Sequence, residues 1–383
     1  MNALAAHTVF LTLAGSHAHG TARAGSDVDL RGVCIVPLDA RLSLRHDFEQ
    51  FDGVLPDDLL TIARPVLERH ETAQHGLDEK VEGVVYDLAK FLRLCVAANP
   101  NALEILFADP RDEVHTSPAW RRIHDARSLF LTRKVEQTFH GYARAQLNRI
   151  KSHRSWLLSP PKAPPLREDF GLPAHNSPLG RDDHNRVAAA IAEKVRGYGI
   201  DDLEMPRATR IAVQERLTDL ISDALNAPAS DLDAHLDAVA SDALGLPEAV
   251  IATLAAEKRY RAARKHWTAY QTWLRQRNSA RAELEREFGY DTKHAMHLVR
   301  LMRMGIEALE LQTLRVRRPD ADELLAIRDG ALSYDALLAE TERLGERLAA
   351  AAAQTRLPET VNLDAVDRLA VSLMVDPSGN GRA

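Results

Sequence analysis

Two aspartates near the N-terminus are the residues of this sequence best placed to do chemistry. Asp27 and Asp29 stand two positions apart in the run SDVDLRGV at residues 26–33, and residues two apart in a strand share a face. Carboxylates paired in this way suit hard divalent cations, because Mg²⁺ prefers oxygen ligands and binds through one or two carboxylates beside substrate phosphates. We therefore predict that Asp27 and Asp29 are catalytic and hold two Mg²⁺ ions, or Mn²⁺.

A glycine and a serine precede this pair. Gly15 and Ser16 follow the apolar, β-branched stretch TVFLTLA at residues 8–14, which predicts a short buried strand. Gly15 permits a tight turn, and a helix or a nest of backbone N–H groups opening at Ser16 would direct several donors at an anion. The expected anion is phosphate, so Gly15 and Ser16 are predicted nucleotide-binding residues for a nucleoside triphosphate.

The combined pattern resembles the DNA polymerase beta-type nucleotidyltransferase superfamily, in which a strand ends in Gly-Ser or Gly-Gly and Asp-x-Asp or Asp-x-Glu stands on the next strand. The stretch GSHAHGTARAGSDVDLRGV is similar to the RlaP type, a group associated with RNA repair. Further segments with this likeness are KFLRLCVAANPNALEILF at 90–107, GYARAQLNRIKSHRSWL at 141–157 and GYDTKHAMHLVRLMRMGIEALE at 289–310. Collinear segments are a more specific signal than one short motif.

The resemblance implies a third carboxylate, supplied by a later strand near the attacking hydroxyl. Glu82 opens the apolar run EGVVYDLAKF and is our candidate for this catalytic, metal-binding residue. Asp87 is the second choice for this ligand, because a structural role is about as well suited to it: it could cap the helix that follows. Asp78 and Glu79 also stay open.

Strand signals are concentrated in residues 1–110. Besides the two strands above, they include a possible strand at 47–55 and the run KVEGVVYDL at 80–88, which leads into a helix. The pattern becomes helical from about residue 111. We predict an α+β fold with a small mixed-sheet nucleotidyltransferase core at 1–110, followed by a large α-helical region at 111–376.

The helical region contains one conspicuous interruption. Residues 159–178 are rich in proline and cannot form regular helix or sheet, so they predict an ordered functional loop or a lid. Residues 377–383 predict a flexible tail.

A second group of candidate residues lies on a helix predicted around residues 290–300. Lys293, His297 and Arg300 fall at i, i+4 and i+7, which places them on one face. Fixed cations on that face would neutralise charge on the phosphates, so these three are predicted to bind the nucleotide. The alternative is an ordinary helix with a basic solvent face. Asp291 is expected to cap this helix or to support the face.

Charge and aromatic content bear on the partner. The net charge of −6 argues against a generally basic nucleic-acid coat, but the blocks 121–154 and 257–281 are basic and contain interleaved aromatic residues. That combination suits single-stranded nucleic acid, so RNA is the expected partner. Amphipathic helices with their aromatics in the core explain each block about equally well.

Composition limits the setting of the protein. Its two cysteines, Cys34 and Cys95, lie in apolar contexts, which indicates neither a disulfide framework nor a thiolate metal site. No segment approaches the roughly 18 apolar residues that a membrane span needs, and the apolar N-terminal stretch lacks the basic residues of a secretory signal. We expect a cytoplasmic protein without membrane partners.

The predicted function is metal-dependent transfer of a nucleoside monophosphate from a triphosphate to an acceptor hydroxyl. The family resemblance and the basic blocks favour an RNA 3′ end. A protein hydroxyl stays open, since minimal nucleotidyltransferases with a similar Gly-Ser and Ser-Asp-x-Asp-Leu signature adenylylate proteins. A nucleotide- or RNA-binding module that lacks turnover is the third possibility.

Overall fold

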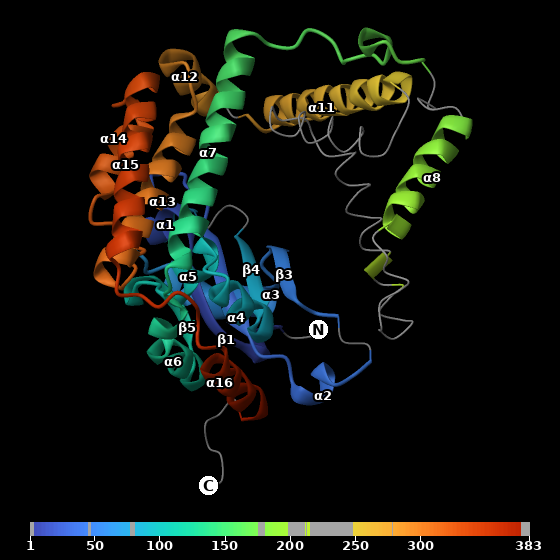
Figure 1. Ribbon diagram of the computed structural model, residues 1–383. Coiled ribbons are helices and arrows are strands. Elements are labelled where there is room, and N and C mark those ends of the chain that lie inside the picture. The colour runs from blue at the N-terminus through green and yellow to red at the C-terminus, as the bar shows by residue number, and fades with distance from the viewer. Residues whose placement is uncertain are drawn as a thin grey trace. The chain divides into compact units, whose positions relative to one another are not determined.

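In the computed structural model (Figure 1), the chain folds into two compact units. The first unit combines Met1–Leu157 with Ala280–Ala383, and the second is Leu158–Ser279. The structure describes residues 4–44, 47–76, 81–174, 181–197, 211, 213–214, 248–277 and 279–376. Of the predicted segments, the tail at 377–383 and the last part of the proline-rich loop, 175–178, lie outside the described residues.

A five-stranded mixed sheet forms the centre of the first unit (Figure 1). Its strands are β1 (Thr8–Leu13), β2 (Asp29–Cys34), β3 (Gln50–Val54), β4 (Glu82–Asp87) and β5 (Glu113–Thr116), in the spatial order β3-β4-β2-β1-β5. Strands β2 and β4 pair in parallel, and the other neighbours pair antiparallel. A mixed sheet followed by many helices confirms the predicted α+β class.

Helices and short 3₁₀ segments make up most of the remaining elements. The α-helices are α1 (Gly15–His19), α2 (Leu38–Arg41), α3 (Asp57–Leu67), α4 (Leu88–Val96), α5 (Pro100–Leu106), α6 (Pro118–Asp125), α7 (Lys134–Leu158), α8 (Arg181–Gly197), α11 (Glu248–Gln276), α12 (Ser279–Phe288), α13 (Thr292–Leu311), α14 (Ala321–Arg328), α15 (Tyr334–Gln354) and α16 (Leu363–Val375). The 3₁₀ segments are η1 (Leu4–His7), η2 (Ala73–Gly76), η3 (Pro110–Asp112), η4 (Arg127–Phe130) and η5 (Glu168–Phe170).

Strand β1 explains why the sheet is covered on both faces. All six of its residues are buried, and from Phe10 onward its apolar side chains enter two different cores, because successive side chains in a strand point to opposite faces. Phe10 joins a large core shared with α4, α6, α7, α13 and α15, where its ring stacks on Trp120 with centroids 3.9 Å apart. Leu11 and Leu13 join a smaller core that includes Leu59 of α3.

Two features differ from the sequence pattern. Strand β5 lies within the stretch predicted to be helical, and it pairs with β1 at the edge of the sheet. Its four residues, EVHT, are too few to give a recognisable alternation. The predicted helical region also has an earlier interruption, where η4 separates α6 from α7. The domain boundary near residue 110 stays a prediction.

The second unit contains a polar contact that fixes η5 against α11. Arg167 is buried and forms an ion pair with Glu257 of α11. Its guanidinium also lies 5.3 Å from the centre of the Tyr260 ring, a cation–π geometry. The short 3₁₀ segment of the proline-rich loop is therefore ordered against a long basic helix.

None of the helices among the described residues is both long enough and apolar enough to cross a membrane.

The close approach of β1 and β2 makes a stability prediction. A Cβ on Gly32 would lie 2.5 Å from the Phe10 carbonyl oxygen, so we expect Gly32→Ala to lower the free energy of unfolding by about 1–3 kcal/mol through overpacking. A Cβ on Gly141 of α7 would meet nothing within 4 Å, and Gly141→Ala should raise that free energy by about 0.5–1 kcal/mol. Urea denaturation measures both. Equal midpoints for Gly32→Ala and the unmodified chain would contradict the packing.

Candidate active site

The parallel pairing of β2 with β4 brings two of the predicted carboxylates together. Asp29 begins β2, Glu82 begins β4, and the two residues are direct register partners. Neighbouring strands lie about 4.8 Å apart and register partners share a face, so both carboxylates project from the same end of the same face. Both residues are exposed. The structure therefore sets an open pair of acids at one end of the central strands.

Asp27 lies beside the strand rather than within it. We expected both aspartates on one strand, but β2 begins only at Asp29. A turn explains the late start: the Ser26 N–H donates to the Arg23 carbonyl at 2.9 Å, and the Arg23 N–H donates to the Ser26 hydroxyl at 2.9 Å. The Asp27 carboxylate is still close enough to raise the pKa of Asp29.

The pKa of Asp29 reports how these charges are arranged. Partial desolvation of the carboxylate raises the pKa of Asp29 most, while the Arg31 guanidinium opposes the rise. Asp27 and Glu82 raise it further, because like charges disfavour ionisation. A bound cation would relieve this repulsion, and three carboxylates supply the oxygen ligands that Mg²⁺ and Mn²⁺ prefer. The residues therefore fit a hard divalent cation.

Among the described residues, Asp27, Asp29 and Glu82 are not found as a group with one ligand atom from each residue within 4.8 Å of the others. Their side chains would therefore have to rotate toward one another to share a bound ion.

The predicted phosphate turn adjoins Asp29. Gly15 has a φ of +59°, and a Cβ at this position would lie 3.1 Å from Asp29 Oδ2, so both backbone conformation and space favour glycine. The Ala14 N–H donates to the Asp29 carbonyl at 2.9 Å, which fixes the turn against β2. Gly15 and Ser16 open α1, and the Ala14 side chain does not cap its first turn.

A cavity of about 310 Å³ lies beside the acids and reveals residues that the sequence pattern missed. Asp29, Arg31 and Glu82 line it together with Asp52 and Tyr86. Arg31 donates to the Tyr86 hydroxyl at 3.4 Å. Asp52 comes from β3, and only the pairing of β3 with β4 brings it here, so no local signal in the sequence identified it.

Asp87 has the structural role that the sequence left open. Its side chain accepts from the Ala89 N–H at 3.1 Å and so caps α4. Asp87 is also buried and forms an ion pair with Arg41. Asp78 and Glu79, the remaining candidates for a third ligand, lie outside the described residues.

The predicted face of α13 lines a larger pocket. Lys293, His297 and Arg300 border a cavity of about 820 Å³, together with Tyr142 and Arg149 of α7. Lys293 is exposed, and its charge lowers the pKa of Asp29. Its ammonium is therefore within electrostatic reach of the carboxylates. Arg149 was missed because α7 and α13 are far apart in the sequence, although it belongs to the first basic block.

Arg300 is buried, and it ties α13 to α1. Its guanidinium donates to Glu104 of α5, and the other oxygen of Glu104 lies 3.3 Å from His19 Nε2. Burial alone would raise the pKa of Glu104, but the Arg300 guanidinium and His19 hold it well below its usual range. An ionised Glu104 thus joins the phosphate turn to the helix that bears Lys293.

His297 is suited to hydrogen bonding rather than to charge neutralisation. Burial lowers the pKa of His297 well below its usual value, and the positive charge of Arg300 lowers it further. The imidazole is therefore neutral at physiological pH and offers one N–H donor to the pocket.

Comparison with known proteins agrees with this geometry. Residues 2–157 match the family model described as RlaP, RNA repair pathway DNA polymerase beta family. The match confirms the predicted resemblance over this part of the chain and supports a nucleotidyltransferase. The segment at 289–310, which also showed the likeness, lies beyond the matched residues. No curated protein and no solved structure matches the chain.

Different roles for Glu82 and Asp87 can be separated by experiment. Glu82→Gln removes an exposed ligand charge, so Mn²⁺ affinity should fall at least about 10-fold, while the free energy of unfolding changes by less than about 0.5 kcal/mol. Asp87→Asn keeps a capping side chain but breaks a buried ion pair, so it should cost about 3 kcal/mol of stability and leave Mn²⁺ affinity unchanged. Titration calorimetry and urea denaturation measure the two quantities. The reverse pattern would make Asp87 the ligand.

Proposed function

We propose that this protein is a metal-dependent nucleotidyltransferase that transfers a nucleoside monophosphate from a nucleoside triphosphate to the 3′ hydroxyl of an RNA. The observation that carries the proposal is the register of β2 and β4, which sets Asp29 opposite Glu82 beside the turn at Gly15. The family description names both a DNA polymerase beta family and an RNA repair pathway, which supports the reaction class and the acceptor.

In this proposal Asp27, Asp29 and Glu82 hold two Mg²⁺ ions, or Mn²⁺. When bound, such ions stabilise the attacking and leaving oxygens of an in-line displacement and the charge that develops on them. Glu82 lies at the outer end of β4 and is exposed, so we assign it to the side of the acceptor. There its carboxylate helps to draw off the proton of the attacking hydroxyl.

The phosphates occupy the space between the turn and α13. The backbone N–H groups at the start of α1, at Gly15 and Ser16, bind phosphate oxygens, as helix N-termini do. Lys293 neutralises charge on the triphosphate as pyrophosphate leaves, and neutral His297 donates a hydrogen bond. Arg300 forms an ion pair with Glu104, so we assign it a positioning role: it holds the face of α13 that carries Lys293 near the phosphates.

Basic helical surfaces support RNA as the acceptor. In the first basic block Phe130 and Phe139 are buried, whereas Tyr142 is exposed in the same pocket as Arg149. The core interpretation therefore holds for two of those aromatics, and Tyr142 offers a ring for base stacking next to a cation. Helix α11 of the second unit presents exposed basic residues, namely Arg259, Arg261, Arg264, Lys265 and Arg275.

The test is transfer of label from α-³²P nucleoside triphosphates, each incubated with total RNA and separately with total cellular protein. We expect label on RNA, lost by at least about 100-fold in the double variant Asp27→Asn/Asp29→Asn, since metal-ion stabilisation contributes several kcal/mol. Asp57→Asn is the matched control, because Asp57 is an exposed carboxylate on α3 outside both cavities.

Each other outcome has a defined meaning. Undiminished transfer by the double variant would refute the assignment of the two aspartates. Label on protein with none on RNA would contradict RNA as the acceptor but would support nucleotidyl transfer as the reaction. Nucleotide binding without any labelled polymer would contradict turnover and leave a binding module.

A further inference from the structure

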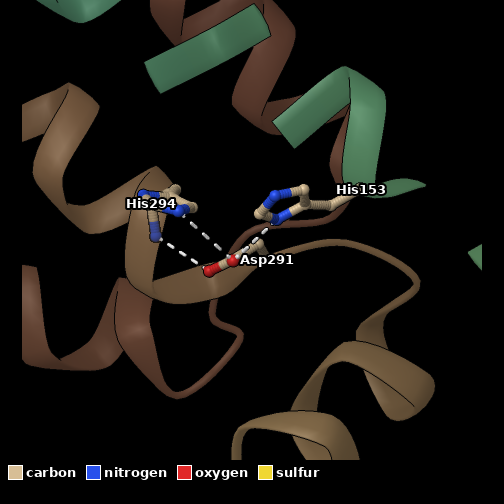
Figure 2. Close-up of side chains that lie close together, drawn as sticks. All are labelled: His153, Asp291 and His294. Atoms are coloured by element: carbon tan, nitrogen blue, oxygen red, sulfur yellow. Dashed lines mark hydrogen bonds and ion pairs between the residues drawn. The ribbon is translucent and has the colours of Figure 1, made fainter. Parts of the chain in front are cut away.

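Three side chains outside the carboxylate site converge at the ends of two helices in the first unit. His153 lies near the C-terminal end of α7, Asp291 is the N-cap of α13, and His294 lies in the first turn of α13. Figure 2 shows both imidazole rings turned toward the Asp291 carboxylate. One ligand atom from each residue lies within 4.8 Å of the others. These are nitrogen and oxygen donors, in contrast to the all-carboxylate set beside the phosphate turn.

The spacing of the donor atoms matches a metal ion of ordinary size. His153 Nδ1 lies 3.1 Å from Asp291 Oδ2, and His294 Nε2 lies 3.6 Å from the same oxygen. A tetrahedral ion with bonds of about 2.0–2.2 Å needs ligand atoms roughly 3.3–3.6 Å apart. The two separations from Asp291 are near that range, and one nitrogen of each imidazole lies within 4.8 Å of one nitrogen of the other, so side-chain rotations would complete the geometry.

The surrounding contacts hold the three residues in place before any ion binds. Asp291 Oδ1 accepts a hydrogen bond from the backbone N–H of His294 at 3.0 Å. The other carboxylate oxygen, Oδ2, is the one that lies near the two imidazoles. Arg154 donates to the Gly289 carbonyl at 2.7 Å and so joins the end of α7 to the turn before α13. The His153 ring stacks on Trp156 at 5.4 Å. Supporting contacts of this kind orient metal ligands in known sites.

Burial of the carboxylate is a further observation. Asp291 is 0% exposed, and the low polarity around a buried ionised carboxylate strengthens its attraction for a bound cation.

We propose that His153, Asp291 and His294 form a binding site for a divalent transition metal, for which Zn²⁺ is the fitting ion. Two imidazoles and one carboxylate are a ligand set typical of zinc, whereas Mg²⁺ prefers oxygen throughout. The ion would pin the end of α7 to the start of α13 and so fix the helix that presents Lys293. This inference is independent of the proposed transfer reaction.

The test is zinc binding by the full chain after chelator treatment, measured by competition with a chromophoric chelator and by elemental analysis. We expect one tightly bound Zn²⁺ per chain. Asp291→Asn should weaken binding at least about 100-fold, since losing a ligand costs more than losing an outer-shell partner, and asparagine still caps α13. His294→Gln should have the same effect. His140→Gln, an exposed histidine on α7, is the matched control and should bind as the unmodified chain does.

Two results would overturn the site: no tight Zn²⁺ in the unmodified chain, or unchanged affinity in both ligand variants. Either would leave a hydrogen-bonded His-Asp-His cluster. Circular dichroism in chelator checks that the variants fold, and His153→Gln replaces any variant that does not. Asp27→Asn/Asp29→Asn should retain the zinc, so failure of the carboxylate site and failure of this site give different results.

Discussion

The parallel pairing of β2 with β4 is the constraint on which the site depends. A shift of one residue in that pairing would turn Glu82 to the opposite face of the sheet and separate it from Asp29. Glycines permit close packing on both sides of β2. A Cβ on Gly83 of β4 would lie 3.2 Å from the Leu30 carbonyl oxygen of β2, and a Cβ on Gly32 of β2 would lie 2.5 Å from the Phe10 carbonyl oxygen of β1. The three central strands are therefore packed tightly within a few residues of the acids.

A buried polar link extends this order from the sheet to the later helices. Glu104 lies between His19 of α1 and Arg300 of α13. Loss of Arg300 would leave the buried carboxylate of Glu104 with too little compensating charge, which makes such a link costly to break. The link couples the position of Lys293 to the position of the phosphate turn. In the proposed reaction, the acids of the sheet therefore act together with the C-terminal helices of the first unit, although these helices lie far from the sheet in the sequence.

The sequence predicts best what depends on neighbouring residues. Apolar runs located β1, β2 and β4, and the capping role of Asp87 was visible from its place before a helix. Contacts between distant segments were not predictable in this way. Asp52 reaches the acids only through the pairing of β3 with β4, and Arg149 lines the same pocket as Lys293 although α7 and α13 are far apart in the sequence. The start of β2 after Asp27 was also missed, since side-chain hydrogen bonds in the preceding turn decide it.

The most direct test of the account is a crystal structure with Mn²⁺ and a nonhydrolysable nucleoside triphosphate, with the ions located by anomalous scattering. The account predicts two Mn²⁺ ions about 3.5–4 Å apart, ligated by Asp27, Asp29 and Glu82, with the phosphates against Gly15 and Ser16. Anomalous peaks away from these carboxylates, or a triphosphate bound elsewhere on the protein, would contradict it.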